Sequence, residues 1–430
     1  MDRAVSASET HRAITGVWKN ESAKLIAALA GVVRDVGLAE EFAHDALVAA
    51  LEEWPASGVP ARPGAWLMTT ARNRALNLLR HRRVIDRKHE TVGHELDSHL
   101  PLEAVEAALE AGMDDDVADD VLRLVFTACH PVLSKEARVA LTLRLLGGLS
   151  TEEIARAFLS TEPTIAQRIV RAKRALTEAK VPFEVPRGPE LGERLAAVLE
   201  VVYLIFNEGY VASAGDDVMR PALQGEALRL GHLLSELAPE EPEVIGLLAL
   251  MELQASRAEA RIDASGEPIL LMDQDRARWD RARIERGLSA LERARARGGV
   301  AGPYQLQAAI AACHARARTP DETDWPRIAE LYGELAERHP SPVVELNRAI
   351  AVSRAEGPAR GLILLEALTT QPALARYHLL PSARADLLER LGRHEAARAE
   401  FERAASLTDN ARQRQRLLER AAACARAIRG

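Results

Sequence analysis

The chain has 430 residues, enough for about three domains, and 47% of them are hydrophobic while only 4% are aromatic. Abundant Ala, Leu, Glu and Arg with few β-branched runs predict an all-α protein. Three distant cysteines, Cys129, Cys313 and Cys424, exclude a disulfide framework and favour a reducing cytoplasm. No signal-peptide core is present and the longest apolar run, near 196–206, is too short for a bilayer, so we expect a cytoplasmic protein without membrane contact.

The net charge of −7 hides an uneven distribution. Residues 1–180 hold 23 basic and 26 acidic side chains, but eleven of the acids lie between Glu90 and Asp120, where Lys and Arg are absent. Outside that window the first 180 residues are net positive. This pattern predicts two basic modules, 10–83 and 119–180, joined by an acidic linker at 84–118.

The first module begins with two expected helices. Apolar spacing predicts one helix over 25–36, ended by Gly37, and a second over 39–54. The apolar stripe of the second helix is Phe42, Ala46, Leu47, Ala50 and Leu51, and its other face carries Glu40, Glu41, Asp45, Glu52 and Glu53.

A third helix is expected from near Gly64, after the Pro- and Gly-rich loop 55–64. Arg62 to Lys88 contains eight basic residues and one acid. A positive groove with amides and an aromatic side chain suits single-stranded DNA. The candidate contacts are Trp66, Arg72, Asn73, Arg74, Asn77 and Arg80. The alternative is a solvated basic face over a core of Trp66, Leu67, Ala71 and Leu78.

The acidic linker is expected to be extended by self-repulsion, with one short helix near 102–109. The histidines at 89, 94 and 99 lack the i, i+4 spacing of a zinc-binding helix, and Cys129-His130 has no second ligand pair nearby. We therefore expect neither a metal nor another cofactor. Pro131 is expected to follow the end of one helix, and Ser134 to cap the next.

Residues 139–176 read as a helix-turn-helix. Gly147 and Gly148 end one helix, Ser150 and Glu153 form a capping box, and Thr161 caps the last helix. Pro163 lies in the first turn of that helix, and its inward stripe is Ile165, Ile169, Ala172 and Leu176. Its other face offers candidate contacts to bases and phosphates in a major groove: Thr164, Gln167, Arg168, Arg171 and Arg174. An ordinary helical hairpin with a solvated basic face is the alternative.

Residues 181–430 open with a Pro-rich break and contain 33 Arg, no Lys and 37 acids, so they lack a basic stripe. Residues 390–394 separate two helices in which small and large residues alternate, and a weaker copy surrounds Gly357. This spacing is typical of a tetratricopeptide-like helical repeat, whose concave surface binds a peptide or another protein. The alternative is a helical cap on the first two modules.

The order of an acidic-faced helix, a Pro-rich loop, the helix AWLMTTARNRALNLLR, a linker and a helix-turn-helix resembles a bacterial sigma factor of the extracytoplasmic-function group (group IV of the sigma-70 family). The resemblance implies that 39–54 contacts the clamp of core RNA polymerase, with Glu41, Asp45, Leu47 and Leu51 as candidate residues. It also implies that 55–80 melts and holds the −10 promoter element and that the helix-turn-helix reads the −35 element. The family often has Gln-Glu in place of His44-Asp45 and an aromatic residue in place of Leu51.

The phrase VVYLIFNEGY at 201–210 resembles the subgroup of these factors that has a tetratricopeptide-like extension. That resemblance implies small proteins of the YCII or DGPF type as candidate partners. We interpret the chain as a transcription initiation factor that binds core RNA polymerase and promoter DNA, with an extension that regulates its activity.

Two other classes of protein fit the sequence less well. The first is a one-component helix-turn-helix activator with a repeat-built sensor, which usually binds a palindrome as a dimer. The first basic module would then have no role. The second is an enzyme, but no nucleophile elbow, phosphate loop or metal spacing is present, and Glu208 is a lone carboxylate.

Overall fold

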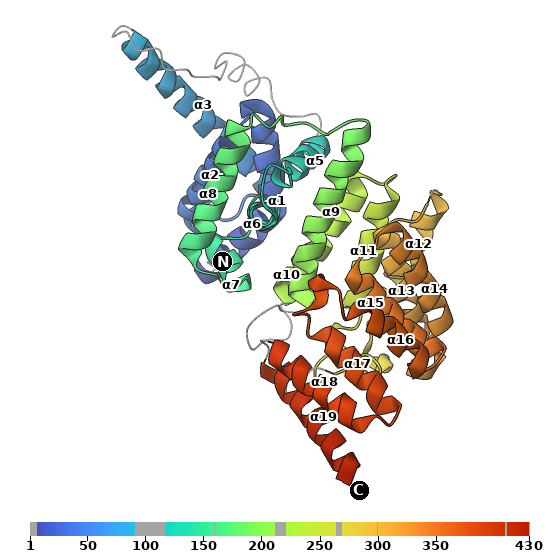
Figure 1. Cartoon of the computed structure of the whole chain (residues 1–430). Coiled ribbons are helices and arrows are strands. Elements are labelled where there is room, and N and C mark those ends of the chain that lie inside the picture. The colour runs from blue at the N-terminus through green and yellow to red at the C-terminus, as the bar shows by residue number, and fades with distance from the viewer. Residues whose placement is uncertain are drawn as a thin grey trace. The chain divides into compact units, whose positions relative to one another are not determined.

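The computed structural model describes residues 7–90, 117–158, 160–210, 221–263, 269–298, 300–408 and 411–429, and these form helices and connecting turns without a β-strand (Figure 1). The predicted all-α fold is confirmed. The chain divides into two compact units, Met1–Leu204 and Ile205–Gly430, which are described separately.

The first unit contains two modules. The first module consists of α1 (Ala7–Val33), α2 (Val36–Ser57) and α3 (Pro63–Glu90), and the second of α5 (Val117–Ala128), α6 (Lys135–Leu145), α7 (Thr151–Ala157) and α8 (Glu162–Glu178). α9 (Pro189–Tyr210) begins in this unit and ends in the other.

The boundary between α1 and α2 differs from the prediction. α1 ends at Val33, Arg34 adopts a left-handed φ of 56°, and Asp35 caps α2 by accepting a hydrogen bond from the Leu38 amide at 2.8 Å. An aspartate is a strong N-cap because its carboxylate accepts an orphan amide hydrogen. Gly37 therefore lies in the first turn of α2 instead of ending α1.

The C-terminal ends of α2 and α3 also extend beyond the expected residues. α2 continues through Pro55 to Ser57, and Gly58 closes it with a φ of 81°. α3 continues to Glu90, past the expected module end at 83. The core of the first module includes Phe42, Trp54 and Leu67, each about 1% exposed. The rest of the expected linker and its short helix at 102–109 lie outside the described residues.

The second module follows its predicted capping closely. Ser134 accepts from the Ala137 amide at the start of α6. Ser150 and Glu153 form the predicted capping box, because each side chain accepts a hydrogen bond from the other residue's amide, at 2.8 and 3.0 Å. Cys129 is 1% exposed beside the Thr142 hydroxyl, and burial raises the pKa of its thiol to about 11.

The first compact unit extends beyond the expected module end at 180. Arg194 of α9 is 7% exposed and donates a hydrogen bond to the Phe126 carbonyl of α5 at 3.0 Å. Lys135 of α6 pairs with Glu200 of α9. These contacts explain why the compact unit runs to Leu204, past the Pro-rich break that suggested a boundary.

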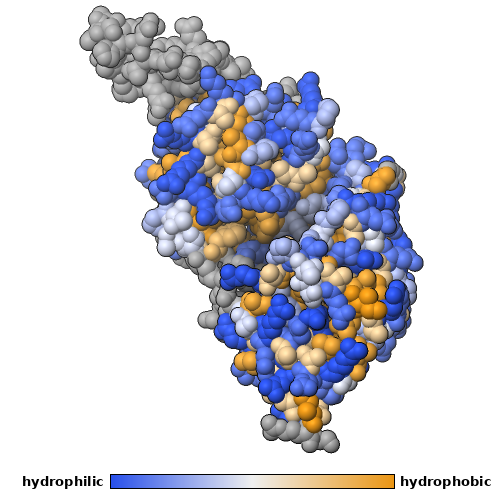
Figure 2. Space-filling view, viewed as in Figure 1, coloured by the Kyte–Doolittle hydropathy of each residue, from blue (hydrophilic) through white to orange (hydrophobic). Residues whose placement is uncertain are grey.

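The second unit is a series of helices in which each packs mainly on its neighbours along the chain. After the end of α9 they are α10 (Pro221–Leu237), α11 (Pro242–Ala255), α12 (Arg281–Ala296), α13 (Pro303–Arg316), α14 (Trp325–Arg338), α15 (Pro342–Ala355), α16 (Pro358–Leu368), α17 (Leu379–Arg390), α18 (His394–Leu407) and α19 (Ala411–Arg429). Short 3₁₀ helices are η1 (Ala258–Ala260), η2 (Arg276–Arg278), η3 (Pro320–Glu322) and η4 (Pro372–Leu374). On the visible face of this unit, apolar residues form patches among hydrophilic ones (Figure 2).

Both turns predicted near the C-terminus are present. Gly392 separates α17 from α18 with a φ of 72°, and Gly357 precedes α16 with a φ of 103°. The predicted small-and-large stripes enter one buried cluster that includes Ala385, Phe401 and Leu365. The helical pairs are therefore as expected, while their assignment as tetratricopeptide repeats stays a prediction.

Gly209, in the segment VVYLIFNEGY at 201–210, has a packing role. A Cβ atom built on Gly209 would lie 2.4 Å from the backbone nitrogen of Gln224 in α10. No side chain fits between backbones this close, so Gly209 allows the end of α9 to approach α10. Leu223, Ala227 and Leu230 of α10 are buried, as the apolar spacing predicted.

Candidate nucleic-acid interface

α8 separates an inward apolar stripe from an outward polar face. Thr161 caps the helix by accepting from the Thr164 amide, and Pro163 occupies the first turn, where a missing N–H is tolerated. The four predicted inward side chains are at most 5% exposed: Ile165, Ile169, Ala172 and Leu176. The inward half of the helix-turn-helix prediction is confirmed.

The predicted DNA-contacting side chains lie on the other face of α8. Thr164, Gln167, Arg171 and Arg174 are exposed, and Arg168 is partly exposed. The Arg174 side chain is 78% exposed and its Nε donates to Glu178 Oε1 at 2.6 Å, which raises the pKa of Arg174. Gln167 and Arg174 are about 10 Å apart along the helix, so one groove could be contacted by the whole row.

One exposed side chain on α8 was not predicted. Val170 is 63% exposed, three residues after Gln167 and four before Arg174. The signal was present in the sequence, because Val170 lies off the inward stripe of Ile165 and Ile169 on an otherwise polar face. An apolar side chain at such a place can contact the methyl group of thymine.

On α3, the predicted contacts have different environments. Asn73 and Asn77 are exposed, while Arg72 and Arg74 are partly exposed. Leu67 and Ala71 are buried, as the predicted core of this helix requires. The side chain of Arg80 lies outside the described residues, as does that of Leu78.

Trp66 is partly buried on α3. Its ring meets that of Trp54 edge to face, with centroids 5.3 Å apart and planes at 68°. Trp54 is 1% exposed, so Trp66 is held against the core of the first module. This contact holds the Trp66 ring in one orientation. A flexible side chain on the surface would have no such fixed orientation.

The predicted polymerase-contacting residues lie along the outer face of α2. Glu41 is exposed, Leu51 is 37% exposed and the Asp45 side chain is 47% exposed, while Leu47 is partly buried. Val48, 46% exposed, was missed. We call Glu41, Asp45, Val48 and Leu51 the α2 ridge; within it, Asp45 also lies 4.0 Å from Arg74 of α3.

Glu40 does not lie on the exposed face of α2, where it was expected. It is 3% exposed. Its Oε1 accepts from Arg144 Nε of α6 at 2.6 Å, and its Oε2 pairs with Lys173 of α8. Arg144 also lies 2.7 Å from His44 Nε2 through its Nη2. We call Glu40, His44, Arg144 and Lys173 the Glu40 cluster.

The electrostatics of the Glu40 cluster favour the ionised carboxylate. Burial alone raises the pKa of Glu40, but the positive charges of Lys173 and Arg144 outweigh that effect and the pKa lies below its ordinary value. Burial and the charge of Arg144 lower the pKa of His44. This cluster leaves no local pattern along the chain, because the partners of Glu40 on α6 and α8 are distant from it in sequence.

Within the described ranges, no group of three His, Cys, Asp or Glu side chains is placed to hold a metal ion. His94 and His99, part of the histidine spacing considered in the linker, fall outside those ranges. No helix in the described part of the chain is long and apolar enough to cross a membrane.

Comparison with family models matches both modules. Residues 19–84 match Sigma-70 region 2, and residues 123–176 match Sigma-70, region 4. The chain belongs to the sigma-70 family. It is a sigma factor like those of the extracytoplasmic-function group, with a C-terminal extension, and the two regions support a role in promoter recognition for transcription initiation.

The extension of this sigma factor matches a family of unknown function (DUF6596) over residues 194–295. An uncharacterised protein of Rhizobium meliloti (strain 1021) is 44% identical over 385 residues, which cover 89% of each chain. The similarity thus covers most of the chain, and therefore most of the extension. No solved structure matches this chain.

Proposed function

We propose that this sigma factor binds core RNA polymerase through the α2 ridge, holds the melted −10 element against α3 and reads the duplex −35 element with α8. The observation that carries the proposal is the division of α8, whose apolar side chains are buried while Gln167, Arg171 and Arg174 are exposed. A helix divided in this way can enter a major groove without losing its own packing.

Reading of the −35 element is assigned to the first turns of α8. Gln167 and Arg168 offer hydrogen-bonding groups to base edges, and Thr164 lies next to the N-terminus of the helix. Arg171 and Arg174 lie further along and are proposed to contact phosphates, which position the helix without reading sequence. Val170, exposed among them, is proposed to contact a thymine methyl group.

Capture of the −10 strand is assigned to α3 and the loop before it. Asn73 and Asn77 are exposed and can form hydrogen bonds with unpaired bases, and Arg72 and Arg74 add positive charge. Trp66, held by Trp54, offers a rigid aromatic edge for a flipped or unstacked base. Arg80 is included among the proposed −10 contacts on the basis of its position in the sequence alone.

Binding of the polymerase is assigned to the α2 ridge. Val48 and Leu51 are apolar and exposed, and Glu41 and Asp45 flank them. An exposed apolar pair with a charged rim is the usual composition of a protein-binding patch. Leu47, partly buried on the same helix, completes the proposed contact.

The extension is proposed to regulate activity by binding a protein partner. The helices of the second unit pack in sequence order, as they do in repeat proteins that offer long binding surfaces. Its 33 Arg and 37 acids make residues 181–430 nearly neutral, which argues against a second DNA-binding surface. The resemblance to the subgroup with such extensions suggests small YCII- or DGPF-type proteins as the partners to test.

Run-off transcription with core RNA polymerase and a set of candidate promoters tests the proposal. We expect initiation that depends on this protein and on both promoter elements. The alternative, a helix-turn-helix activator, predicts tight duplex binding by the protein alone and no support of core polymerase. That result would replace the proposed function with the activator.

A further inference from the structure

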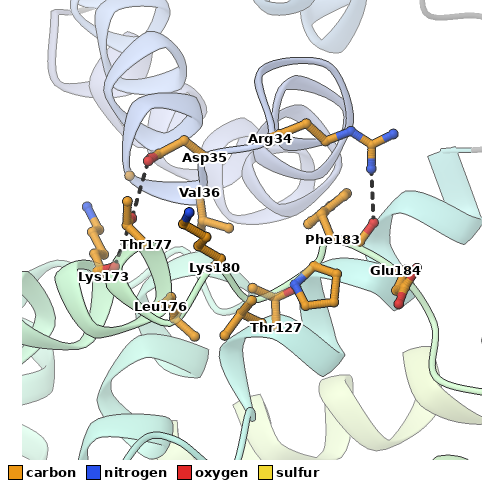
Figure 3. A pocket seen from close by; sticks show the side chains of 13 residues that line it. Arg34, Asp35, Val36, Thr127, Lys173, Leu176, Thr177, Lys180, Phe183 and Glu184 are labelled. Carbon is orange, nitrogen blue, oxygen red and sulfur yellow. Dashed lines mark hydrogen bonds between the residues drawn. The ribbon is translucent and has the colours of Figure 1, made fainter. Parts of the chain in front are cut away.

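Figure 3 shows a cavity of about 540 Å³ in the first unit, where several charged side chains bind other groups of the protein. Arg34 donates to the Phe183 carbonyl at 3.3 Å. Thr177 donates to Asp35 Oδ2, also at 3.3 Å, and Lys173 belongs to the Glu40 cluster. Much of the charge in this cavity is therefore satisfied within the protein.

A cavity of about 350 Å³ in the second unit has a different character. One face of α13 lines it with Leu306, Ala309, Cys313 and Arg316, which recur every three or four residues. α14 contributes Leu331. Leu306, Ala309 and Leu331 are at most 4% exposed. The cavity therefore has an apolar floor made by two packed helices.

Three exposed arginines also line this cavity: Arg295 of α12, Arg316 of α13 and Arg327 of α14. Arg327 is engaged, because its Nη1 donates to Glu330 Oε2 at 2.8 Å and its Nη2 lies 3.6 Å from Glu334 Oε1. Arg295 and Arg316 form no ion pair or side-chain hydrogen bond with any residue that the structure describes. The protein thus leaves two guanidinium groups unpaired here, although the extension as a whole is nearly neutral.

Gln305 adds a buried polar group to the same cavity. It lines the cavity and is 6% exposed. Its backbone amide donates to Glu243 Oε1 at 3.1 Å, but its side-chain amide forms no hydrogen bond within the described part of the chain. Buried amides are nearly always paired, so this side chain favours a polar ligand in the cavity.

The thiol of Cys313 lies within the influence of all three arginines. Burial, together with the charge of Asp324, raises the pKa of this thiol, and the positive charges of Arg316, Arg327 and Arg295 oppose that rise. The three charges therefore act on one point of the cavity. A planar guanidinium group binds a carboxylate or a phosphate through two parallel hydrogen bonds, so this arrangement suits an anion.

We propose that this cavity binds a small organic dianion, either a dicarboxylate or a phosphate monoester. Its negative charges pair with Arg295 and Arg316, its carbon skeleton packs on Leu306 and Leu331, and Gln305 forms a hydrogen bond with it. The volume is near the lower limit of about 300 Å³ for ligand pockets, which suits a small molecule. This inference goes beyond the proposed function and does not rest on it, because binding can be measured without DNA or polymerase.

Alkylation of Cys313 in the full-length protein tests whether the cavity attracts anions. Iodoacetate is an anion and iodoacetamide is neutral, and both react with the same thiolate, so the pKa of the thiol cancels from the ratio of their rates. Mass spectrometry of the peptide that contains Cys313 follows each reaction. We expect the ratio of the iodoacetate rate to the iodoacetamide rate to exceed that of N-acetylcysteinamide by about fivefold or more. Equal ratios for the protein and this model thiol would overturn the proposal.

A pair of double variants separates the cavity from the general charge of the protein. Arg295→Gln with Arg316→Gln should return the ratio close to that of the model thiol, while circular dichroism shows that the fold is retained. Arg293→Gln with Arg318→Gln removes the same charge from exposed positions that do not line the cavity, and it should leave the ratio unchanged. If both double variants lower the ratio equally, the attraction does not come from this cavity and the site is wrong.

Ligand-observed NMR tests binding itself without using Cys313. The dianionic probes are glutarate and phenyl phosphate, and their neutral controls are glutaramide and phenol. We expect saturation transfer from the full-length protein to at least one dianion, little transfer to its neutral control, and a loss of about fivefold or more in Arg295→Gln with Arg316→Gln. The dianion with the stronger signal identifies the preferred head group. If neither dianion receives saturation, or if the two double variants give equal signals, the cavity is not a dianion site.

Discussion

The indole rings of Trp54 and Trp66 meet edge to face, which fixes the one aromatic side chain of α3 that we assign to the −10 strand. Under the proposed function, Trp66 has two roles: it packs against Trp54 and it captures a base. They can be separated because Trp66→Phe keeps an aromatic face at the same place, whereas Trp66→Ala removes it.

We expect Trp66→Ala to reduce promoter melting by about five- to 150-fold, since stacking of one base on an aromatic ring contributes about 1–3 kcal/mol. Permanganate reactivity of unpaired thymines in the −10 region measures the effect. Trp66→Phe should retain most of the melting. Circular dichroism controls for loss of structure. If Trp66→Ala, with an intact helical signal, melts the promoter normally, the −10 assignment of this residue is wrong.

Gln167 and Arg174 of α8 are expected to act differently. Gln167→Ala or Arg168→Ala should cost about 1–3 kcal/mol on the correct −35 sequence and flatten the preference among −35 variants. Arg174→Ala should weaken binding to all sequences about equally and reduce the salt slope by about one. Holoenzyme binding to a set of −35 variants at several salt concentrations gives both readouts. If Gln167→Ala and Arg168→Ala both leave the rank order of the −35 variants unchanged, α8 does not read the promoter.

The α2 ridge can be tested by reversing its charge. Glu41→Lys with Asp45→Lys should weaken binding to core polymerase at least tenfold without loss of helical content, because both carboxylates are exposed beside Val48 and Leu51. A titration with core enzyme measures the affinity. Glu52→Lys with Glu53→Lys makes the same change in net charge further along α2 and is the control. Equal affinities for the two double variants would place the contact elsewhere.

The contacts of α9 predict where the sigma modules can be separated from the extension. A chain ending at Lys180 loses Arg194 and Glu200 and leaves the Phe126 carbonyl without its buried donor, at a cost of about 1–3 kcal/mol. A chain ending at Leu204 keeps these contacts. We expect the shorter chain to melt several degrees lower and to lose most promoter-dependent transcription. Full activity of the shorter chain would show that the modules do not need the extension, whereas increased activity would indicate inhibition by it.

The second unit should lose stability in acid through His314. Burial, with the charges of Arg257 and Arg276, lowers the pKa of this imidazole from 6.5 to about 3. As the pH falls, the unfolded chain takes up the proton first, so this contribution is complete above about pH 6.5 and decreases between 6.5 and 3. The slope approaches about 1.4 kcal/mol per pH unit.

Urea unfolding of the full chain between pH 7 and 4 measures this slope. His314→Phe keeps an aromatic ring near Trp325, which now meets the imidazole edge-on at 5.3 Å, and should flatten the pH dependence. His339→Phe, a change at a more exposed histidine, is the control. A slope that is the same in His314→Phe and wild type would contradict the role given to His314.

The sequence predicted the local structure of the second module because its signals act over three or four residues. Ser150 with Glu153 and Thr161 with Thr164 find their partners within one helical turn, and the apolar period places Ile165 and Ile169 inward. Apolar spacing alone places the start of α2 too late, because Asp35, which caps this helix, is a stronger boundary signal than Gly37.

Glu40 could not be placed from the sequence. Its helical position puts it at the edge of the α2 apolar stripe, next to Glu41, which is exposed. The difference between the two depends on Arg144 and Lys173, which tertiary packing brings from other helices. A charged residue at the border of an apolar stripe is buried only when oppositely charged side chains from other helices pack against it. The periodicity of the sequence does not show whether such partners are present.

Cys129 has a practical consequence for every experiment that uses introduced cysteines. It is the one cysteine before residue 313, it is buried, and burial raises the pKa of its thiol to about 11. Reactive thiolate is therefore scarce there at neutral pH, and alkylating dyes or oxidants have little access to it. Introduced cysteines therefore meet no competing reactive thiol within the sigma modules, whose native sequence can stay otherwise intact, while the partly exposed Cys313 of the second unit has to be replaced first.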